Sequence, residues 1–179
     1  MLFQTSQQFW WNKMILTKKK ILDAIRKKEI VISPFNKKNV GAGSIDLTID
    51  NKFRIFKKNR TIKLNENSDY KKYTKLVKAS KILIEPGEMI LGITKEKIKL
   101  PQNLCGWLQG RSRFARLGLA VHVTASFVQP GSENKQVLEI INLGKNPIEI
   151  HAGDKICQLI LERTEGKAKF KGKFVNQKL

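Results

Sequence analysis

The sequence predicts a mainly β protein, a distorted β-barrel or jelly-roll with one helix ahead of it. Many short apolar segments of strand length follow the helix, and turn signals separate many of them, for example at Pro86, Pro130 and Gly153. The chain shows no internal repeat, and its 179 residues are enough for one domain with a buried core. We therefore expect a single all-β domain.

The expected helix comes first. Thr17 precedes the segment KKKILDAIRKK, in which Ile21, Leu22 and Ile25 fall on one face. This spacing is typical of an amphipathic helix, and Thr17 is suited to its N-cap.

The expected strands follow in chain order: EIVIS, SIDLTI, KFRIF, KILIEP, EMILGIT, KIKL, LCGWLQ, LAVHVTA, QVLEIIN, IEIHA and ICQLILE. Residues 59–80 are polar and rich in lysine, which predicts a surface excursion. The segment RSRFARLG fits one helical turn between two strands, and the free N–H groups of such a turn favour anions. Beyond Arg163 the apolar periodicity ends, so we expect a tail that is mobile until it meets a ligand.

The chain is strongly basic, with a formal charge of +20. Its lysines are spread over several elements, and aromatic residues are not interleaved with them, so we expect solvated lysine faces and no nucleic-acid partner. The positive field should still attract a triphosphate. No apolar run approaches the roughly 18 residues of a membrane span. Residues 1–13 lack the pattern of a signal peptide, so we interpret them as an extension upstream of a start at Met14 and expect a cytoplasmic protein.

One stretch of the chain carries chemical groups at close spacing. Arg111, Arg113 and Arg116 surround Ser112, and Glu139 follows within the apolar strand KQVLEII. Guanidinium groups bind phosphate oxygens through forked hydrogen bonds. A carboxylate with apolar neighbours is suited to carry a proton, because burial raises its pKa toward neutrality. The combination predicts chemistry on a nucleotide.

The same stretch resembles a known family. GRSRFARLGLAVHVTA is similar to the signature of dCTP deaminases, which belong to the dUTPase-like superfamily. GSIDLTIDNKFRIF, LPQNLCGWLQGRS and KFVNQ resemble three further segments of the family, so the similarity runs from Met14 to Gln177. The resemblance implies a dUTPase-like (β-clip) barrel over residues 14–163 and a tail, residues 164–179, that closes over the site. It also implies a homotrimer whose active sites lie between subunits.

The resemblance further implies deamination of dCTP to dUTP and ammonia, with Mg²⁺ bound through the substrate triphosphate. Zinc-dependent nucleobase deaminases need an H-x-E motif together with P-C-x-x-C, and the sequence has neither. With Cys105, Cys157, His122 and His151 as its only cysteines and histidines, the chain shows no zinc-site pattern. We therefore expect deamination without zinc.

By resemblance, Glu139 is the general base, which takes a proton from water as that water attacks C4 of cytosine. Ser112 hydrogen-bonds within the site and helps to place the water, although a serine here could simply cap the following turn. Arg116 would hold Glu139, whereas Arg111 and Arg113 would contact phosphates. Arg113 stands where the family usually has serine, and a solvent-facing side chain remains the alternative.

The remaining expected substrate contacts also follow from the resemblance. Main-chain groups near Val123 and Ala125 would orient water and the exocyclic amine. The other expected contacts are Thr124, Gln129, Val137, Lys173 and Gln177, the last two from the tail, for which disorder is the alternative. A histidine in an apolar strand is usually a structural residue, which is our interpretation of His122. We interpret Asp46 as a buried, hydrogen-bonded acid.

The chain departs from the family pattern in the loop TASFVQPGSENK. Gln129 stands where the family has an aspartate that contacts the 3′-hydroxyl of the sugar, Ser132 replaces an aromatic residue, and Asn134 replaces a glycine. An amide can hydrogen-bond the sugar but cannot act as a base against the α-phosphate. The sequence therefore favours a deaminase. The alternatives are a dUTP diphosphatase or bifunctional relative, and a nucleotide-binding regulator without turnover; dTTP is a candidate inhibitor.

Overall fold

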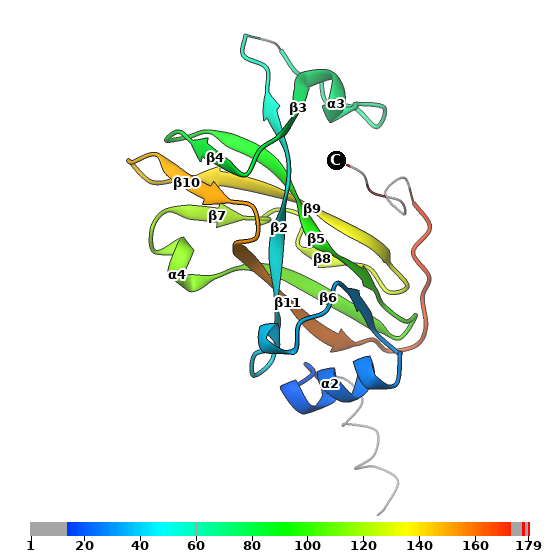
Figure 1. Ribbon diagram of the computed structural model, residues 1–179. Coiled ribbons are helices and arrows are strands. Elements are labelled where there is room, and N and C mark those ends of the chain that lie inside the picture. Colours follow the sequence, from blue (N-terminus) through cyan, green and yellow to red (C-terminus); the bar gives the residue numbers. More distant parts are fainter. Residues whose placement is uncertain (1–13, 60, 173–176, 178) are drawn as a thin grey trace, which may run out of the picture.

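Antiparallel strands make up most of the fold (Figure 1). The computed structural model describes residues 14–59, 61–172, 177 and 179. In chain order the elements are α2 (Lys18–Arg26), β1 (Val31–Ser33), the 3-10 helix η1 (Lys37–Asn39), β2 (Ile45–Phe56), α3 (Tyr70–Tyr73), β3 (Thr74–Lys78), β4 (Lys81–Ile84), β5 (Met89–Lys99), β6 (Leu104–Gly110), α4 (Ser112–Ala115), β7 (Leu119–Val121), β8 (Phe127–Val128), β9 (Glu133–Asn142), β10 (Ile148–His151) and β11 (Lys155–Arg163).

Within the described residues, seven strands pair in the order β7-β9-β5-β2-β11-β6-β8, while β1 pairs with β5 and β3 pairs with β2. The strands β4 and β10 form a separate pair. Every one of these pairings is antiparallel. The large sheet curls around a core of isoleucine and leucine side chains. This architecture confirms the predicted all-β barrel-like fold with its N-terminal helix.

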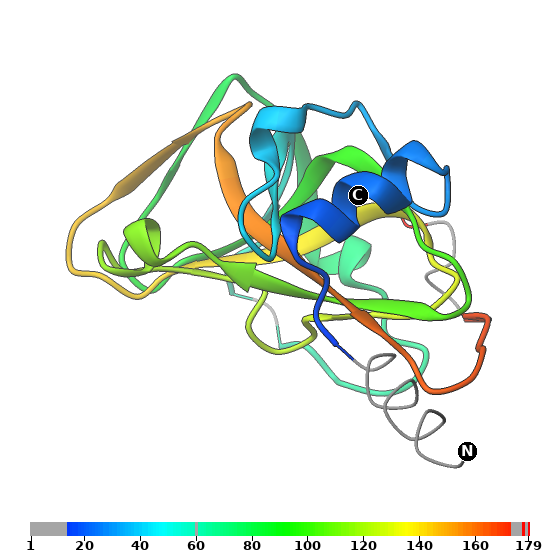
Figure 2. The same ribbon diagram turned by 90° about the horizontal axis from the view of Figure 1, so that it is seen from below.

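The helix α2 covers the lower end of the sheet (Figures 1 and 2). The chain ahead of it pairs with β11, through a bridge between Ile15 and Glu162. Its own residues Ile21 and Ala24 are buried in the hydrophobic core. Thr17 occupies the predicted N-cap position, but its side chain makes no capping hydrogen bond.

Several strands differ from their predicted extent. SIDLTI and KFRIF are two halves of the single long strand β2, and EMILGIT and KIKL are two halves of β5. The polar residues 59–80 are mostly exposed where the structure describes them, as expected of a surface excursion, but they also contain α3 and the strand β3, which pairs with the end of β2. The predicted strand LAVHVTA ends at Val121, because His122 adopts a left-handed conformation with φ of 52°.

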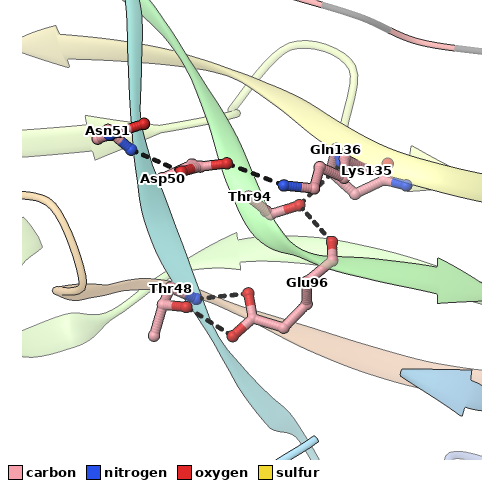
Figure 3. A network of polar contacts seen from close by, with 7 residues as sticks. All are labelled: Thr48, Asp50, Asn51, Thr94, Glu96, Lys135 and Gln136. Carbon is pink, nitrogen blue, oxygen red and sulfur yellow. Dashed lines mark hydrogen bonds and ion pairs between the residues drawn. The ribbon is translucent and has the colours of Figure 1, made fainter. Parts of the chain in front are cut away.

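A buried polar network joins β2, β5 and β9 where the register of β5 shifts (Figure 3). The carboxylate of Glu96 accepts hydrogen bonds from the Thr48 backbone N–H at 2.9 Å and from its hydroxyl at 2.6 Å. The Thr94 hydroxyl donates to the Glu96 backbone oxygen at 2.8 Å and accepts from the Gln136 N–H at 2.9 Å. These bonds replace the regular ladder at the bulge, so the network satisfies backbone groups that the register shift leaves unpaired.

The network should contribute measurably to stability. We expect Glu96→Ala to lower the free energy of unfolding by about 2 kcal/mol, because it leaves the partly buried N–H and hydroxyl of Thr48 without their acceptor. Urea unfolding followed by circular dichroism measures this change. Glu66→Ala, at an exposed loop position, is the control and should stay within about 0.5 kcal/mol of the parent protein. Equal losses in the two variants would contradict the role assigned to the network.

Candidate active site

The candidate site lies on one face of the sheet, centred on the pairing of β5 with β9. Glu139 on β9 is the register partner of Leu91 on β5, and Leu91 is in turn the partner of Arg54 on β2. Directly paired residues project to the same face of a sheet, so these three side chains form one row. The row ends at His122, whose backbone N–H donates to the Glu139 carbonyl oxygen at 2.7 Å.

A pocket of about 730 Å³ opens over this row. Its walls come from β5, β8, β9, the end of β2, the segment after β7, the start of α3, and the C-terminal residues. The residues that line it are Phe56, Asp69, Tyr70, Lys71, Met89, Leu91, His122, Ala125, Phe127, Val128, Gln129, Ser132, Asn134, Gln136, Val137, Glu139, Phe170 and Gln177. The volume and the mixture of apolar walls with a few polar groups are typical of a small-molecule site.

Glu139 and His122 form the most closely coupled charged pair of the pocket. His122 Nδ1 lies 2.6 Å from Glu139 Oε2, and the His122 side chain is only 9% exposed. The angles of this contact depart from those of a regular hydrogen bond. The short distance still places the imidazole and the carboxylate in direct contact, in a partly buried setting where water screens polar interactions less.

The pKa of Glu139 corrects the sequence-based expectation. Burial alone would raise the pKa of this carboxyl group, as predicted, but the contact with His122 and the positive charge of its ring lower it by more. The net result is a pKa below the ordinary value of 4.5. Glu139 is therefore a carboxylate at neutral pH, which is the form that accepts a proton from water.

Several predicted contacts meet in this pocket. Ala125, Gln129, Val137, Glu139 and Gln177 all line it. Phe170 joins them because residues 168–170 run beside the sheet, with the Phe170 N–H donating to the Pro130 carbonyl oxygen at 3.0 Å. Lys173 lies outside the described residues.

Val123 and Thr124 do not line the pocket, and Val123 is 70% exposed. His122 was interpreted as a structural residue, but it is in direct contact with the proposed base. Nothing in the apolar pattern around His122 indicated this, because the contact depends on the left-handed turn that ends β7.

The arginine segment lies apart from the pocket of its own chain. None of Arg111, Ser112, Arg113 or Arg116 is among the described lining residues. In α4, Arg111 rather than Ser112 occupies the N-cap position. Among the described residues, no hydrogen bond or ion pair joins Arg116 to Glu139, so a contact between their side chains stays a prediction.

Arg111 is held by its own chain. Its Nη2 lies 3.1 Å from Asp46 Oδ2, and its Nη1 donates to the Lys155 backbone oxygen at 2.9 Å. Its guanidinium also lies 5.7 Å from the centre of the Phe114 ring. Asp46, interpreted from the sequence as a buried, hydrogen-bonded acid, is only partly buried and pairs with Arg111.

The wall formed by Asp69, Tyr70 and Lys71 was missed in the sequence. The Asp69 side chain caps α3 by accepting a hydrogen bond from the Lys71 N–H. Arg54 contacts both ends of this turn. Its guanidinium donates a hydrogen bond to the Thr74 hydroxyl at 3.0 Å and lies 5.7 Å from the Tyr70 ring centre. The aspartate cap followed by the alternating segment TKLVK was the available signal.

The described residues contain no cluster of three or more His, Cys, Asp or Glu side chains that could hold a metal ion. Among those same residues, no helix is both long enough and apolar enough to cross a membrane.

The dependence of Glu139 on His122 can be measured directly. In a His122→Asn variant we expect the pKa of Glu139 to rise above 4.5, because burial remains while the lowering contact is lost. An NMR titration of the Glu139 side-chain carboxyl carbon follows the change. His151→Asn is the matched control, since His151 pairs with Glu149 at the surface at 2.8 Å. A Glu139 pKa that is unchanged by His122→Asn would refute the assigned cause.

Comparison with known proteins places this geometry in a family. A family model described as dCTP deaminase-like matches residues 15–164. A dCTP deaminase from a Marinomonas species is 40% identical over 167 residues, which cover 87% of this chain and 86% of the relative. A dUMP-forming dCTP deaminase from Nanoarchaeum equitans is 36% identical over 168 residues, with 84% of each chain covered.

The fold agrees with these sequence matches. The crystal structure of a 2′-deoxycytidine 5′-triphosphate deaminase from Agrobacterium tumefaciens superposes with a TM-score of 0.70 at 16% identity. The match covers 86% of this chain but only 49% of that one, so this chain spans about half the length of its structural neighbour. At this identity the superposition shows the fold alone. The family model and the two sequence relatives carry the assignment, and this chain belongs to the dCTP deaminase-like family.

Proposed function

We propose that this protein deaminates dCTP to dUTP with release of ammonia, and that Glu139 is its general base. The observation that carries the proposal is an ionised carboxylate in the wall of a nucleotide-sized pocket, held by His122. Curated relatives that are 40% and 36% identical are named dCTP deaminases, which supports the same activity.

The chemistry requires a water molecule to attack C4 of the cytosine ring. Glu139 takes a proton from this water as the new C4–O bond forms. Ring N3 becomes protonated as this bond forms. When the C4–N bond breaks, Glu139 delivers one proton to the departing amine and the proton of the new hydroxyl is lost to restore the carboxylate, so that ammonia leaves and N3 keeps its hydrogen. The ring keeps a carbonyl oxygen at C4, which makes the product a uracil nucleotide.

The pocket supplies the groups that hold the nucleoside. Ala125 and Val137 line the pocket together with Glu139, and Gln177 approaches from the C-terminal side. In the proposed complex, backbone groups between Val123 and Ala125 orient the water and the amine. We also propose that the tail contacts the triphosphate, which would carry Mg²⁺ through its own oxygens; the expected contact Lys173 lies outside the described residues.

The arginine segment is proposed to complete the site of a neighbouring subunit, with Arg111 and Arg113 as phosphate contacts and Arg116 beside Glu139. Arg111, Ser112, Arg113 and Arg116 do not line the pocket of their own chain, which supports this arrangement. This arrangement requires an oligomer, and we propose a homotrimer in the cytoplasm. Inhibition by dTTP would use the same pocket.

The product is proposed to be dUTP rather than dUMP. Among the described lining residues, only Asp69 and Glu139 carry carboxylates, and the Asp69 side chain is engaged in capping α3. Gln129 lines the pocket but is an amide, which cannot take the proton of a second water that attacks the α-phosphate. The bifunctional reaction is the second candidate, because the relative from Nanoarchaeum equitans is named as dUMP-forming.

Incubation with dCTP and Mg²⁺, followed by anion-exchange separation and an ammonia assay, tests the proposal. We expect dUTP and ammonia in equal amounts, whereas dUMP would establish the bifunctional reaction. Glu139→Gln should lower turnover by about 10³-fold while dCTP binding stays measurable, because only the proton acceptor is lost. Glu149→Gln, at an exposed position, is the control. Binding of dCTP by the parent protein without any product would indicate a nucleotide-binding regulator.

Mixed oligomers test whether the sites are shared between subunits. Glu139→Gln and Arg116→Ala variants, each inactive alone, are unfolded together in equal amounts and refolded. If one chain supplies Glu139 and its neighbour supplies Arg116, random assembly restores roughly a quarter of the parent activity. Glu139→Gln refolded with Glu139→Ala is the control and should stay inactive. The absence of recovery in the first mixture would place both residues in one chain's site.

A further inference from the structure

One end of the pocket is lined by uncharged polar side chains that the proposed reaction does not use. Ser132, Asn134 and Gln136 are 5%, 6% and 5% exposed, and all three line the cavity. On the same strand, β9, Leu138 and Ile140 continue the alternation of Asn134 and Gln136 and lie fully buried in the core. Asn134 and Gln136 therefore occupy strand positions where apolar core residues are expected. Burying a polar side chain there costs free energy unless its polar atoms are hydrogen-bonded.

Gln136 is held firmly but incompletely satisfied. Its backbone N–H donates to the Thr94 hydroxyl at 2.9 Å, within the network of Figure 3. Its side-chain Nε2 donates to Asn134 Oδ1 at 2.6 Å. No described residue donates a hydrogen bond to Gln136 Oε1, and this atom is not sealed from the cavity as Glu139 Oε2 is. Because this oxygen keeps an acceptor position that faces the cavity, a ligand group can donate a hydrogen bond to it.

The position of Gln136 indicates which part of the ligand it meets. Gln136 precedes Glu139 by three residues, about 10 Å along a strand, which is on the scale of a nucleoside. An odd spacing normally separates two side chains to opposite faces of a sheet. Both reach this pocket, and Gln136 lies opposite the bulge of β5, where the ladder between β5 and β9 is interrupted.

The chemistry of this end favours the uncharged part of a nucleotide over its charged parts. Between Gln129 and Gln136 the lining side chains are all neutral, so they match neither a triphosphate nor its metal ion. The base, with its reacting amine, belongs next to Glu139. The neutral and hydroxyl-bearing part that remains is the sugar.

We propose that Gln136 is a specificity-determining residue whose Oε1 accepts a hydrogen bond from a hydroxyl group of the substrate sugar. The inference rests on the proposed nucleotide chemistry of the pocket and adds the group that reads the sugar. The bulge network fixes the Gln136 backbone, and Asn134 fixes its amide plane, so the acceptor is oriented before the ligand arrives. The hydroxyl is either the 3′-hydroxyl of any cytidine nucleotide or the 2′-hydroxyl of a ribonucleotide.

Calorimetric dissociation constants for dCTP, CTP and 2′,3′-dideoxy-CTP, measured with Mg²⁺, distinguish the two sources. If Gln136 binds the 3′-hydroxyl, dCTP and CTP bind alike and the dideoxynucleotide binds roughly tenfold more weakly. If it binds the 2′-hydroxyl, CTP binds roughly tenfold more tightly than dCTP. Affinities that do not depend on the sugar hydroxyls, or no binding of any of the three, would overturn the proposal without any variant.

The variants Gln136→Met and Gln136→Leu assign the effect to this side chain. In either variant the hydroxyl-dependent difference should disappear, while affinity for the dideoxynucleotide stays close to that of the parent protein. Gln102→Met, at an exposed position, is the control and should keep the difference. A folded Gln136 variant that keeps it would refute the assignment. Because the readout is binding, dCTP that binds without being deaminated would count against the proposed function and leave this inference standing.

Discussion

The contact between His122 and Glu139 is the interaction on which the candidate site depends. It places the His122 ring against a carboxyl group whose pKa burial would otherwise raise, and the contact lowers the pKa of Glu139 below its ordinary value, which favours the carboxylate that the proposed chemistry needs. The contact exists because β7 stops at Val121 and the chain turns through a left-handed residue. A left-handed conformation, uncommon outside glycine, thus lies beside the proposed reacting group, and such conformations cluster at functional sites.

The sheet supplies the rigidity behind this pair. Glu139 lies in the middle of β9, which is paired on one side with β5 and on the other with β7. The bulge of β5 interrupts that pairing close to the pocket, and the buried carboxylate of Glu96 compensates by binding the Thr48 backbone and hydroxyl. The same irregularity that would weaken a plain sheet therefore creates the polar end of the pocket, with Gln136 fixed at its edge.

The sequence predicted the fold class, most strands, the helix α2 and Glu139 as a pocket residue, because these follow from periodicity, turn residues and family-like segments. The sequence did not predict that Tyr70 lines the pocket. The polar composition of residues 59–80 gives no sign of the turn that Arg54 holds through its contacts with Tyr70 and Thr74. The direction of the Glu139 pKa was wrong, because composition shows burial but not a partner 17 residues earlier in the chain. The arrangement of Arg111, Ser112 and Arg116 around a shared site stays a prediction, since one chain does not contain the site that they would complete.

The ion pair between Arg111 and Asp46 would affect the entropy cost of binding a triphosphate. A free arginine side chain loses much of its rotational freedom on meeting an anion, and that loss opposes binding. Here Asp46 and the Lys155 carbonyl oxygen already restrain the guanidinium, while the group keeps further N–H donors unused. The Arg111 side chain therefore loses its rotational entropy when the chain folds rather than when a ligand binds. The negative charge of Asp46 also weakens the attraction between the guanidinium and a bound phosphate. An arginine held in this way would favour rapid release of a charged product as much as its capture.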